Sequence, residues 1–480
     1  MDNPVDVPFP PSSAPGLKPQ EAGGRLINTF FTTPAEGAGT DTLWIRSPGL
    51  RQILDGTSLS VNNVHTRGFL DCGSTLLWIV NNRVLAVTRS GSVFTVVDVG
   101  ALSGSLPVTV ARNNNATPQN VVVTDNGCFN LFTASAPTAF ADLDLPASPT
   151  SVCFIDGYFV WSFGDGRIFA SDLNSVSVAS NSFTTEQALF VRRVIPFAGR
   201  LFAFGNKWTG VYKNAGLSPF PFSREVQIPR GIIGTHAISG ADVGWTNELI
   251  WAADDFIVYK LAGYTPVPIS HDDVSRSIEA SVLAGHADLL EASVYMYGRN
   301  PFWVLTDPNN WTWEYNLNTQ RWHERQSYQR DDWKGRRSIK MFDRWLMGEM
   351  VGGKLFEVTG DYFREGPDPL VWSVISGLVS GFPNGMVIPE AAFAITAAVG
   401  SLDTEDDPQV RISWSLDGGY SYGNPLLRPL GGPGESKNIV RIRNMGLSRG
   451  QGVRYKLEVS DPVHVGFAGG KLNPVMRTTG

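Results

Sequence analysis

The chain has 480 residues, of which 42% are hydrophobic and only 18% are charged, and its formal net charge is −6. This length allows two or three domains with substantial cores, and the acidic balance excludes a protein that binds nucleic acid through a broad basic face. An inner surface along which DNA slides would have a similar composition. The 50 glycines and 31 prolines favour short strands joined by turns over a helical bundle.

The N-terminal residues predict an extended arm. Residues 1–24 are rich in Pro, Ser and Gly, and they lack the basic start and the apolar run of a signal peptide. We expect them to be mobile in the free chain and to become ordered against a neighbouring subunit. Together with the first strand-like runs, they form the segment that we assign to residues 1–45. No stretch approaches the ~20 apolar residues of a membrane helix, so we expect no membrane partner.

The middle of the chain predicts a β-propeller over residues 46–365. Short apolar strands recur there in pairs and triplets, and the turns that separate them follow one another at steps of about 35 to 55 residues. A period of about 40–50 residues with a few strands per unit is typical of propeller blades. We predict six or seven blades, with an irregular array of β-sandwiches as the alternative. The aligned turns lie near Gly91, Asn126, Asp165, Asn206, Asp254, Asn309 and Gly352.

A short helical insertion is expected near residues 270–290. Ser270 or Asp272 is a possible N-cap, because both side chains can accept a hydrogen bond from a free backbone N–H of the first turn. Apolar residues at helical spacing follow it, namely Val274, Ile278 and Val282.

Residues 366–480 predict a separate antiparallel β-sandwich. The run "WSLDGGYSYG", residues 414–423, lies within it and is similar to the S-x-D-x-G-x-[ST]-[WY] turn found on sialidase blades. A sialidase needs several such turns on its blades, together with an arginine cluster and a Tyr–Glu pair. This turn occurs outside the blades, so we interpret Asp417-Gly418-Gly419 as a tight hairpin connection. We predict no catalytic residues.

Other polar groups also predict no catalytic, cofactor or metal site. The carboxylates of Asp254-Asp255 and Glu405-Asp406-Asp407 are expected in turns or solvated loops. The run from Gly431 to Asn438 is no phosphate loop, because Pro433 lacks the N–H that such a loop uses. The histidines show no metal-binding spacing, and the cysteines show no C-x-x-C spacing, so we expect reduced, mostly buried thiols. These residues are His65, His236, His271, His286, His323, His464, Cys72, Cys128 and Cys153.

A basic cluster from Arg330 to Lys340 is a further candidate. It could contact DNA phosphates or an acidic neighbour, but we favour a solvated loop between blades. Four nearby tryptophans could belong either to the blade core or to an interface; they are Trp311, Trp313, Trp322 and Trp333.

Taken in order, several runs resemble the packaged-DNA stabilisation protein of short-tailed phages such as P22. They are "INTFFTTP…LWIRSPGL" (27–50), "VRRVIPFAGRLFAFGNKWTGVYKNAG" (191–216), "PVPISHDDVSRSIEA" (266–280) and "SWSLDGGYSYG…VGFAG" (413–469). The resemblance covers nearly the whole chain. One departure is the run "AAFAITAAVG" (391–400), in which relatives tend to carry Glu.

The resemblance implies a structural tail hub, or nozzle, rather than an enzyme. Six copies would form a ring below the portal adaptor, continue the DNA channel, retain packaged DNA and carry tail fibres or spikes. The implied partners are further copies of the chain, the adaptor, a fibre or spike protein, a tail needle or plug, and DNA passing without sequence readout. The expected location is the virion tail, after assembly in the host bacterial cytoplasm. The alternatives are a carbohydrate-binding or carbohydrate-cleaving propeller, such as a host-surface depolymerase, and a scaffold propeller of a cell.

Overall fold

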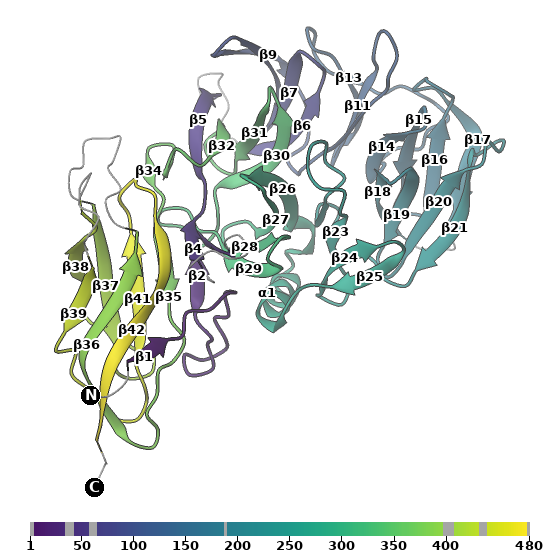
Figure 1. Cartoon of the computed structure of the whole chain (residues 1–480). Helices are drawn as coiled ribbons and strands as arrows, with labels where there is room; N and C mark the ends of the chain where they lie inside the picture. Colours follow the sequence, from purple (N-terminus) through teal and green to yellow (C-terminus); the bar gives the residue numbers. More distant parts are fainter. Residues whose placement is uncertain are drawn as a thin grey trace.

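A computed structural model describes residues 4–33, 43–56, 65–186, 190–396, 408–431 and 439–477, and these residues form an almost entirely β-structured chain. Two bodies lie next to each other (Figure 1). One is a ring of small sheets, and the other is a pair of longer sheets that contains the C-terminal strands. We call the second body the C-terminal module. Residues 25–27 and 43–55 lie between the two bodies (Figure 1).

The ring is the predicted β-propeller, and the described residues give it seven four-stranded blades. Within each blade the strands run antiparallel in chain order, and the first strand lies nearest the axis. The last blade is completed by β5 from the N-terminal part of the chain.

The first four blades consist of β6 (Thr66–Asp71), β7 (Thr75–Val80), β8 (Arg83–Ser90) and β9 (Val93–Ala101); β10 (Thr109–Arg112), β11 (Asn120–Thr124), β12 (Gly127–Leu131) and β13 (Thr138–Ala139); β14 (Ser151–Ile155), β15 (Tyr158–Ser162), β16 (Arg167–Ser171) and β17 (Val178–Thr185); and β18 (Val191–Phe197), β19 (Arg200–Gly205), β20 (Thr209–Asn214) and β21 (Phe222–Ile228).

The last three blades consist of β22 (Ile238–Ser239), β23 (Ile250–Ala252), β24 (Val258–Ala262) and β25 (Thr265–Pro268); β26 (Glu291–Tyr297), β27 (Asn300–Asp307), β28 (Trp311–Asn316) and β29 (Arg321–Glu324); and β30 (Gly335–Met341), β31 (Arg344–Glu349), β32 (Lys354–Thr359) and β5 (Gly49–Asp55).

Turn chemistry and buried aromatic residues explain the blades. The β14–β15 hairpin turns through Asp156 and Gly157, with φ of 51° and 89°, as in the turn type that matches the twist of the two strands. The second strand of five blades buries a tryptophan between neighbouring sheets, where its large apolar area stabilises the stack. These residues are Trp78, Trp161, Trp251, Trp303 and Trp345.

The helical insertion is confirmed as α1 (Asp272–Leu283), followed by the short 3₁₀ helix η2 (Ala287–Leu289). Val274 and Ile278 are buried against the propeller core, and Val282 packs partly against it. The N-cap is His271 rather than Ser270 or Asp272. The Ser270 hydroxyl instead accepts the Val258 N–H at 3.0 Å.

The C-terminal module contains two sheets around one hydrophobic core. One sheet has the order β3-β4-β42-β36-β39, with β1 paired to β42 and β40 to β36, and the other has the order β2-β35-β41-β37-β38. Two short strands, β33 (Arg364–Glu365) and β34 (Asp368–Pro369), extend the seventh blade toward this module. The remaining strands are β1 (Val5–Val7), β2 (Arg25–Ile27), β3 (Thr29–Thr32), β4 (Leu43–Arg46), β35 (Trp372–Ile375), β36 (Gly385–Ile395), β37 (Gln409–Ser415), β38 (Leu426–Pro429), β39 (Val440–Arg443), β40 (Leu447–Ser448), β41 (Arg454–Val459) and β42 (Gly466–Arg477).

The expectation that residues 1–24 form an arm without a packed core is wrong for residues 4–24. Strand β1 pairs with β42, and Phe9 is only 8% exposed, with its ring centroid 4.6 Å from that of Phe467. Ser13 is also buried. The physical reason is the apolar pair Val7 and Phe9, whose burial stabilises the C-terminal core.

Candidate functional site

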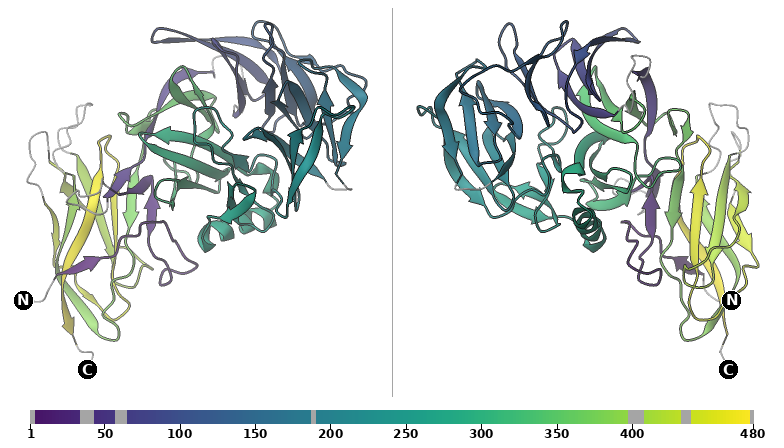
Figure 2. Two further views of the ribbon diagram at one scale, coloured as in Figure 1. Left: turned by 45° about the vertical axis from the view of Figure 1, so that its right-hand side comes forward. Right: turned by 180° about the vertical axis from the view of Figure 1, so that it is seen from behind.

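The propeller and the C-terminal module are connected by strand β2, and we call this connection the joint. Strand β2 runs parallel to β29 of the sixth blade and antiparallel to β35 of the C-terminal module. The outer edge of that blade and one sheet of the module therefore form a single nine-stranded sheet. Figure 2 shows the N-terminal strands that follow β1 between the two bodies in both views. Backbone hydrogen bonds thus cross the joint without interruption.

Polar side chains reinforce the joint. Asn28 has a φ of 51°, and its buried amide donates hydrogen bonds to the carbonyls of Gln326 at 2.7 Å and Val371 at 2.9 Å. One amide therefore bridges the propeller and the C-terminal module. Glu324 accepts hydrogen bonds from Ser13 at 2.5 Å and from Nε of Arg25 at 3.1 Å. Asn tolerates the left-handed region better than most residues, which explains its use at this crossing.

Strand β5 forms the second crossing. It pairs antiparallel with β32 and parallel with β33, and Leu50 is fully buried in the propeller core. Beside it, the Arg325 guanidinium lies 4.3 Å from the ring centroid of Trp333, and the indole N–H of Trp333 donates to Glu365 at 2.7 Å. The chain that leaves β4 therefore completes the ring of blades.

The Asp417 turn lies in a long connection between β37 and β38, whose pairing ends at Ile412 and Leu426, so it is not a tight hairpin; its role is structural. Its carboxylate accepts hydrogen bonds from the Ser415 hydroxyl at 2.5 Å and the Ser421 N–H at 3.0 Å, and these bonds hold the pKa of Asp417 far below its usual range. Gly418 and Gly419 have φ of 79° and 107°. The buried Arg454 donates to the Gly418 carbonyl at 3.1 Å and to the Ala22 carbonyl at 2.6 Å. The turn therefore anchors the N-terminal segment.

Residues 330–334 do connect the sixth and seventh blades, but the interpretation of residues 330–340 as a solvated loop is wrong, because Asp332 and Lys334 are buried. Arg330 pairs with the buried Asp332 at 2.8 Å, and Lys334 pairs with Asp368 at 2.5 Å. Residues from Gly335 onward form β30, the first strand of the seventh blade. The charges of Arg330 and Lys334 are held against the fold because these two carboxylates neutralise them, whereas Lys340 is exposed.

The four candidate tryptophans belong to the propeller. Trp313, Trp322 and Trp333 are buried in its core, and Trp311 packs partly against it. Their indole N–H groups donate hydrogen bonds to Ser281, Ser277, Ile269 and Glu365, in the order Trp311, Trp313, Trp322 and Trp333. They are therefore packing residues in this chain.

One histidine belongs to a buried polar cluster. His323 lies 2.5 Å from Glu314, which also accepts a hydrogen bond from Tyr295. Burial opposes ionisation of Glu314, but the charge and hydrogen bond of His323 outweigh it and lower the pKa of this carboxyl. All three side chains are sealed within the blade.

The other histidines lie apart. His286 contacts Asp307, His65 contacts the Ser105 carbonyl, and the ring of His464 lies tilted against that of Phe363. His271 occupies the N-cap position of α1 without a side-chain capping hydrogen bond, and His236 is buried beside Arg193. No group of three or more His, Cys, Asp or Glu side chains suited to a metal ion occurs among the described residues.

The remaining candidates lie in ordinary structural positions. Asp254 accepts the Gly231 N–H at 2.8 Å, and Asp255 pairs with Arg230 at 3.1 Å. Glu405, Asp406 and Asp407 lie outside the described residues, as do residues 432–438 of the rejected phosphate loop.

The three cysteines are free thiols. Cys153 is buried, and Cys72 and Cys128 are half-buried. Burial raises the pKa of Cys72 to about 11 and the pKa values of Cys128 and Cys153 to about 12. Thiols that ionise so weakly are poor nucleophiles at neutral pH.

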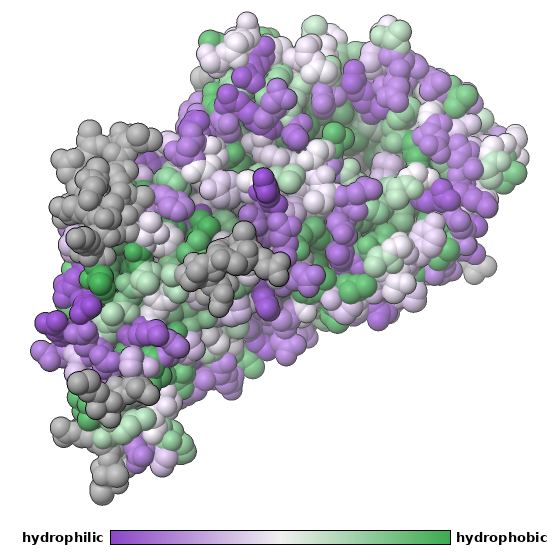
Figure 3. Space-filling view, in the orientation of Figure 1, coloured by the Kyte–Doolittle hydropathy of each residue, from purple (hydrophilic) through white to green (hydrophobic). Residues whose placement is uncertain are grey.

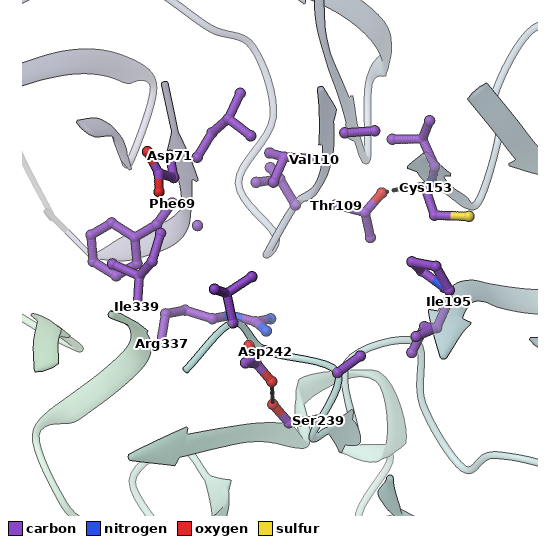
Figure 4. A pocket seen from close by; sticks show the side chains of 18 of the residues that line it. Phe69, Asp71, Thr109, Val110, Cys153, Ile195, Ser239, Asp242, Arg337 and Ile339 are labelled. Atoms are coloured by element: carbon purple, nitrogen blue, oxygen red, sulfur yellow. Dashed lines mark hydrogen bonds between the residues drawn. The ribbon is translucent and has the colours of Figure 1, made fainter. Parts of the chain in front are cut away.

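A cavity of about 430 Å³ occupies the centre of the propeller (Figure 4). The first strands of all seven blades contribute to its lining. No motif in the sequence marks this cavity, because its lining residues lie far apart in the chain. Its charged lining residues are Asp71, Arg112, Arg193, Asp242, Arg337 and Lys340.

The outer surface mixes residue types. Figure 3 shows hydrophobic residues scattered among hydrophilic ones over both bodies, as is normal for protein surfaces. Within the part of the chain that the structure describes, no helix combines the length and the apolar character needed to cross a membrane.

A family match agrees with the propeller architecture. Residues 27–362 match the family described as "Bacteriophage P22 Gp10, beta-propeller". A comparison with curated proteins gives no match.

A comparison with solved structures gives, among others, the WD40 β-propeller domain of Doa1, with a TM-score of 0.42 and 8% identity over 65% of this chain and 97% of that one. PorZ of the type-IX secretion system of Porphyromonas gingivalis has a TM-score of 0.38 and 12% identity over 70% of this chain and 44% of that one. The computationally designed Ika8 protein has a TM-score of 0.37 and 10% identity over 64% of this chain and 100% of that one.

Proposed function

Because the chain belongs to the β-propeller family of bacteriophage P22 Gp10, a family of phage structural proteins, we propose that it is the tail hub of a short-tailed double-stranded DNA phage. The observation that carries this proposal is the family match over residues 27–362. The matched range begins at the joint strand β2 and includes all seven blades with the closing strand β5.

In the proposed assembly, six copies form a ring below the portal adaptor. The ring extends the DNA channel, retains the packaged genome and attaches tail fibres or spikes. Each copy contacts its neighbours through two different faces, and the ring closes because these heterologous contacts repeat by a fixed rotation. DNA passes without sequence readout, and a tail needle or plug is a further proposed partner.

The architecture suits a role in resisting internal pressure. The nine-stranded sheet that spans the joint couples the propeller to the C-terminal module, which we propose is an antiparallel β-sandwich. A continuous sheet resists rotation of one body against the other better than a flexible linker does. The loops at the blade ends are free to provide contact surfaces. The proposed role is therefore structural and not enzymatic, and its proposed location is the virion tail.

The test adds the purified chain to DNA-filled heads that lack their own hub protein. Retention of DNase-resistant genomes and formation of complete tails are the expected results. A matched control is Arg299→Gln, at an exposed position in the β26–β27 turn, which should support both to the same extent. Heads that leak their DNA despite a folded, added chain would contradict the proposal.

The same preparation also tests the alternative that the chain is a carbohydrate-cleaving depolymerase. The same preparation is incubated with sialosides and host polysaccharide, and no turnover is expected. Turnover that disappears when a carboxylate near a blade end is substituted would favour a carbohydrate-cleaving propeller over a tail hub.

A further inference from the structure

The central cavity carries an excess of positive charge. Four cationic side chains and two carboxylates line it, and both carboxylates already accept hydrogen bonds from their own loops. Asp71 accepts the Gly73 N–H at 2.7 Å, and Asp242 accepts the Ser239 hydroxyl at 2.6 Å and the Gly240 N–H at 2.9 Å. The carboxylates are therefore only partly available to neutralise the cations.

A backbone irregularity directs two consecutive arginines inward. Neighbouring residues of a regular strand point to opposite faces, but β30 has a bulge between Arg336 and Ser338, and Arg337 adopts a φ of 53°. Both Arg336 and Arg337 consequently reach the same carboxylate, Glu291. A positive φ at a residue other than glycine is energetically unfavourable, and such strain is concentrated at functional sites.

Arg337 retains free hydrogen-bonding capacity. Its Nε lies 3.0 Å from Glu291, but its Nη2 is buried and meets no hydrogen-bond partner within the described ranges. Figure 4 shows its side chain extending from β30 toward the centre of the cavity. A buried guanidinium N–H without an acceptor is costly, so an acceptor in the cavity would stabilise it.

Arg193 approaches the same space from β18. Its Nη1 lies 3.4 Å from Nδ1 of the buried His236, and its buried Nε has no partner in the part of the chain that the structure describes. Burial and then the charge of Arg337 lower the pKa of Arg193 to about 10. Burial and the same two arginines also hold the pKa of His236 well below its usual value, so this imidazole is neutral at physiological pH. The two guanidinium groups thus face one cavity, in which the Asp242 carboxylate attracts both of them and Glu291 pairs with Arg337.

We propose that the cavity binds a small oxyanion of the phosphate class, held between Arg193 and Arg337. The Nε of Arg193 and the Nη2 of Arg337 would donate charge-assisted hydrogen bonds to its oxygens. Arg112 and Lys340, which also line the cavity, add attraction at longer range. A cavity of about 430 Å³ has the size of a small-molecule site and is too small for a DNA duplex. The bound anion would join inner strands of the fourth and seventh blades across the propeller axis.

This inference does not depend on the proposed tail function, and its test uses the purified full-length chain. Inorganic phosphate is titrated calorimetrically at constant ionic strength, with chloride as the competing salt. Arg193→Gln and Arg337→Gln are each expected to weaken phosphate binding by ~10-fold or more, because each removes a charge-assisted hydrogen bond. Arg299→Gln is the matched control and should bind as the unsubstituted chain does. Equal binding by the unsubstituted chain and both cavity variants would overturn the proposal, as would no binding beyond that of chloride.

A second measurement covers the case in which the glutamine variants fail to fold. Crystals of the unsubstituted chain are soaked with selenate, a tetrahedral analogue of phosphate with an anomalous signal. A peak between Arg193 and Arg337 is the expected result. Crystals that show selenate only at the outer surface would overturn the proposal.

Discussion

The propeller and the C-terminal module are both built from antiparallel strands, but they differ in how far apart in the chain those strands lie. In the first six blades each sheet follows the order of the chain, as in β6-β7-β8-β9, and only the seventh recruits a distant strand, β5. The module instead combines strands from both ends of the chain, as in β3-β4-β42-β36-β39. Local hairpins make the blades, whereas pairing between the two ends makes the module.

This difference shows where the fold is most vulnerable. Non-local pairs form only after the entropy of closing a long loop has been overcome, so the N-terminal strands are a shared requirement of both bodies. β1, β3 and β4 belong to the module, β2 crosses the joint and β5 completes the propeller. Changes in this segment should therefore have larger effects than changes of similar size within a single blade.

Deletion of residues 1–24 is expected to have the largest effect. It removes β1, the buried Phe9 and the buried Ser13, so the C-terminal module should lose its cooperative melting transition while the propeller retains one.

The single change Phe9→Ala should lower the free energy of unfolding by about 3–5 kcal/mol. Differential scanning calorimetry measures both effects. The control is Leu17→Ala, at a side chain that is 69% exposed, and an unchanged module transition in the deletion variant would contradict the account.

Leu50→Ala tests the closing strand of the propeller. This side chain is fully buried, and its truncation should lower the free energy of unfolding by about 2–5 kcal/mol through lost burial and a residual cavity. Urea denaturation followed by tryptophan fluorescence measures the change. Gln52→Ala lies on the same strand at an exposed position and should change stability by no more than about 0.5 kcal/mol. A similar, small effect of both substitutions would argue against closure through β5.

Asn28→Ala tests the coupling of the two bodies. It removes the amide that bridges Gln326 and Val371 and places alanine at a φ of 51°. The expected loss is about 2–3 kcal/mol, with earlier melting of one body than of the other. Asn28→Gly removes the same amide but relieves the backbone strain, so it should cost less. If both variants melt like the unsubstituted chain, the amide does not couple the bodies.

Gly419→Val has the smallest expected effect and is confined to the C-terminal module. A β-branched residue is strained at a φ of 107°, and a Cβ there would lie 2.8 Å from Cδ of Arg454. The expected loss of stability is about 1–3 kcal/mol, seen in the module transition and not in that of the propeller. Gly423→Val is the matched control, because the nearest atom to its Cβ is 3.8 Å away.

The same contrast explains how much the sequence could predict. The blades were recognisable because each is a local unit, and turns such as Asp156-Gly157 mark its hairpins. The helix was recognisable from Val274 and Ile278, although its N-cap was misplaced by one residue. The buried tryptophans on the second strands, such as Trp161 and Trp251, are a further periodic signal that could have strengthened the blade count.

Non-local features were not predictable in this way. Composition alone predicts an arm at residues 1–24. It cannot reveal the pairing of Val5 with Leu472, because these two residues lie at opposite ends of the chain. The charges of the basic run at 330–340 predict a solvated loop. The sequence does not show that Glu291 and Asp368 pair with this run, because both carboxylates lie on other segments. The central cavity is also not predictable from the sequence, since Arg193 and Arg337 come together only when the ring of blades closes.

The most direct test of the proposed tail function is cryo-electron microscopy of phage particles that contain this chain. The account predicts six copies of the seven-bladed propeller around the DNA channel, directly below the portal adaptor, each with its C-terminal module attached at the β2 joint. Propeller density that is absent from the tail, or that occurs there without sixfold symmetry, would contradict the account.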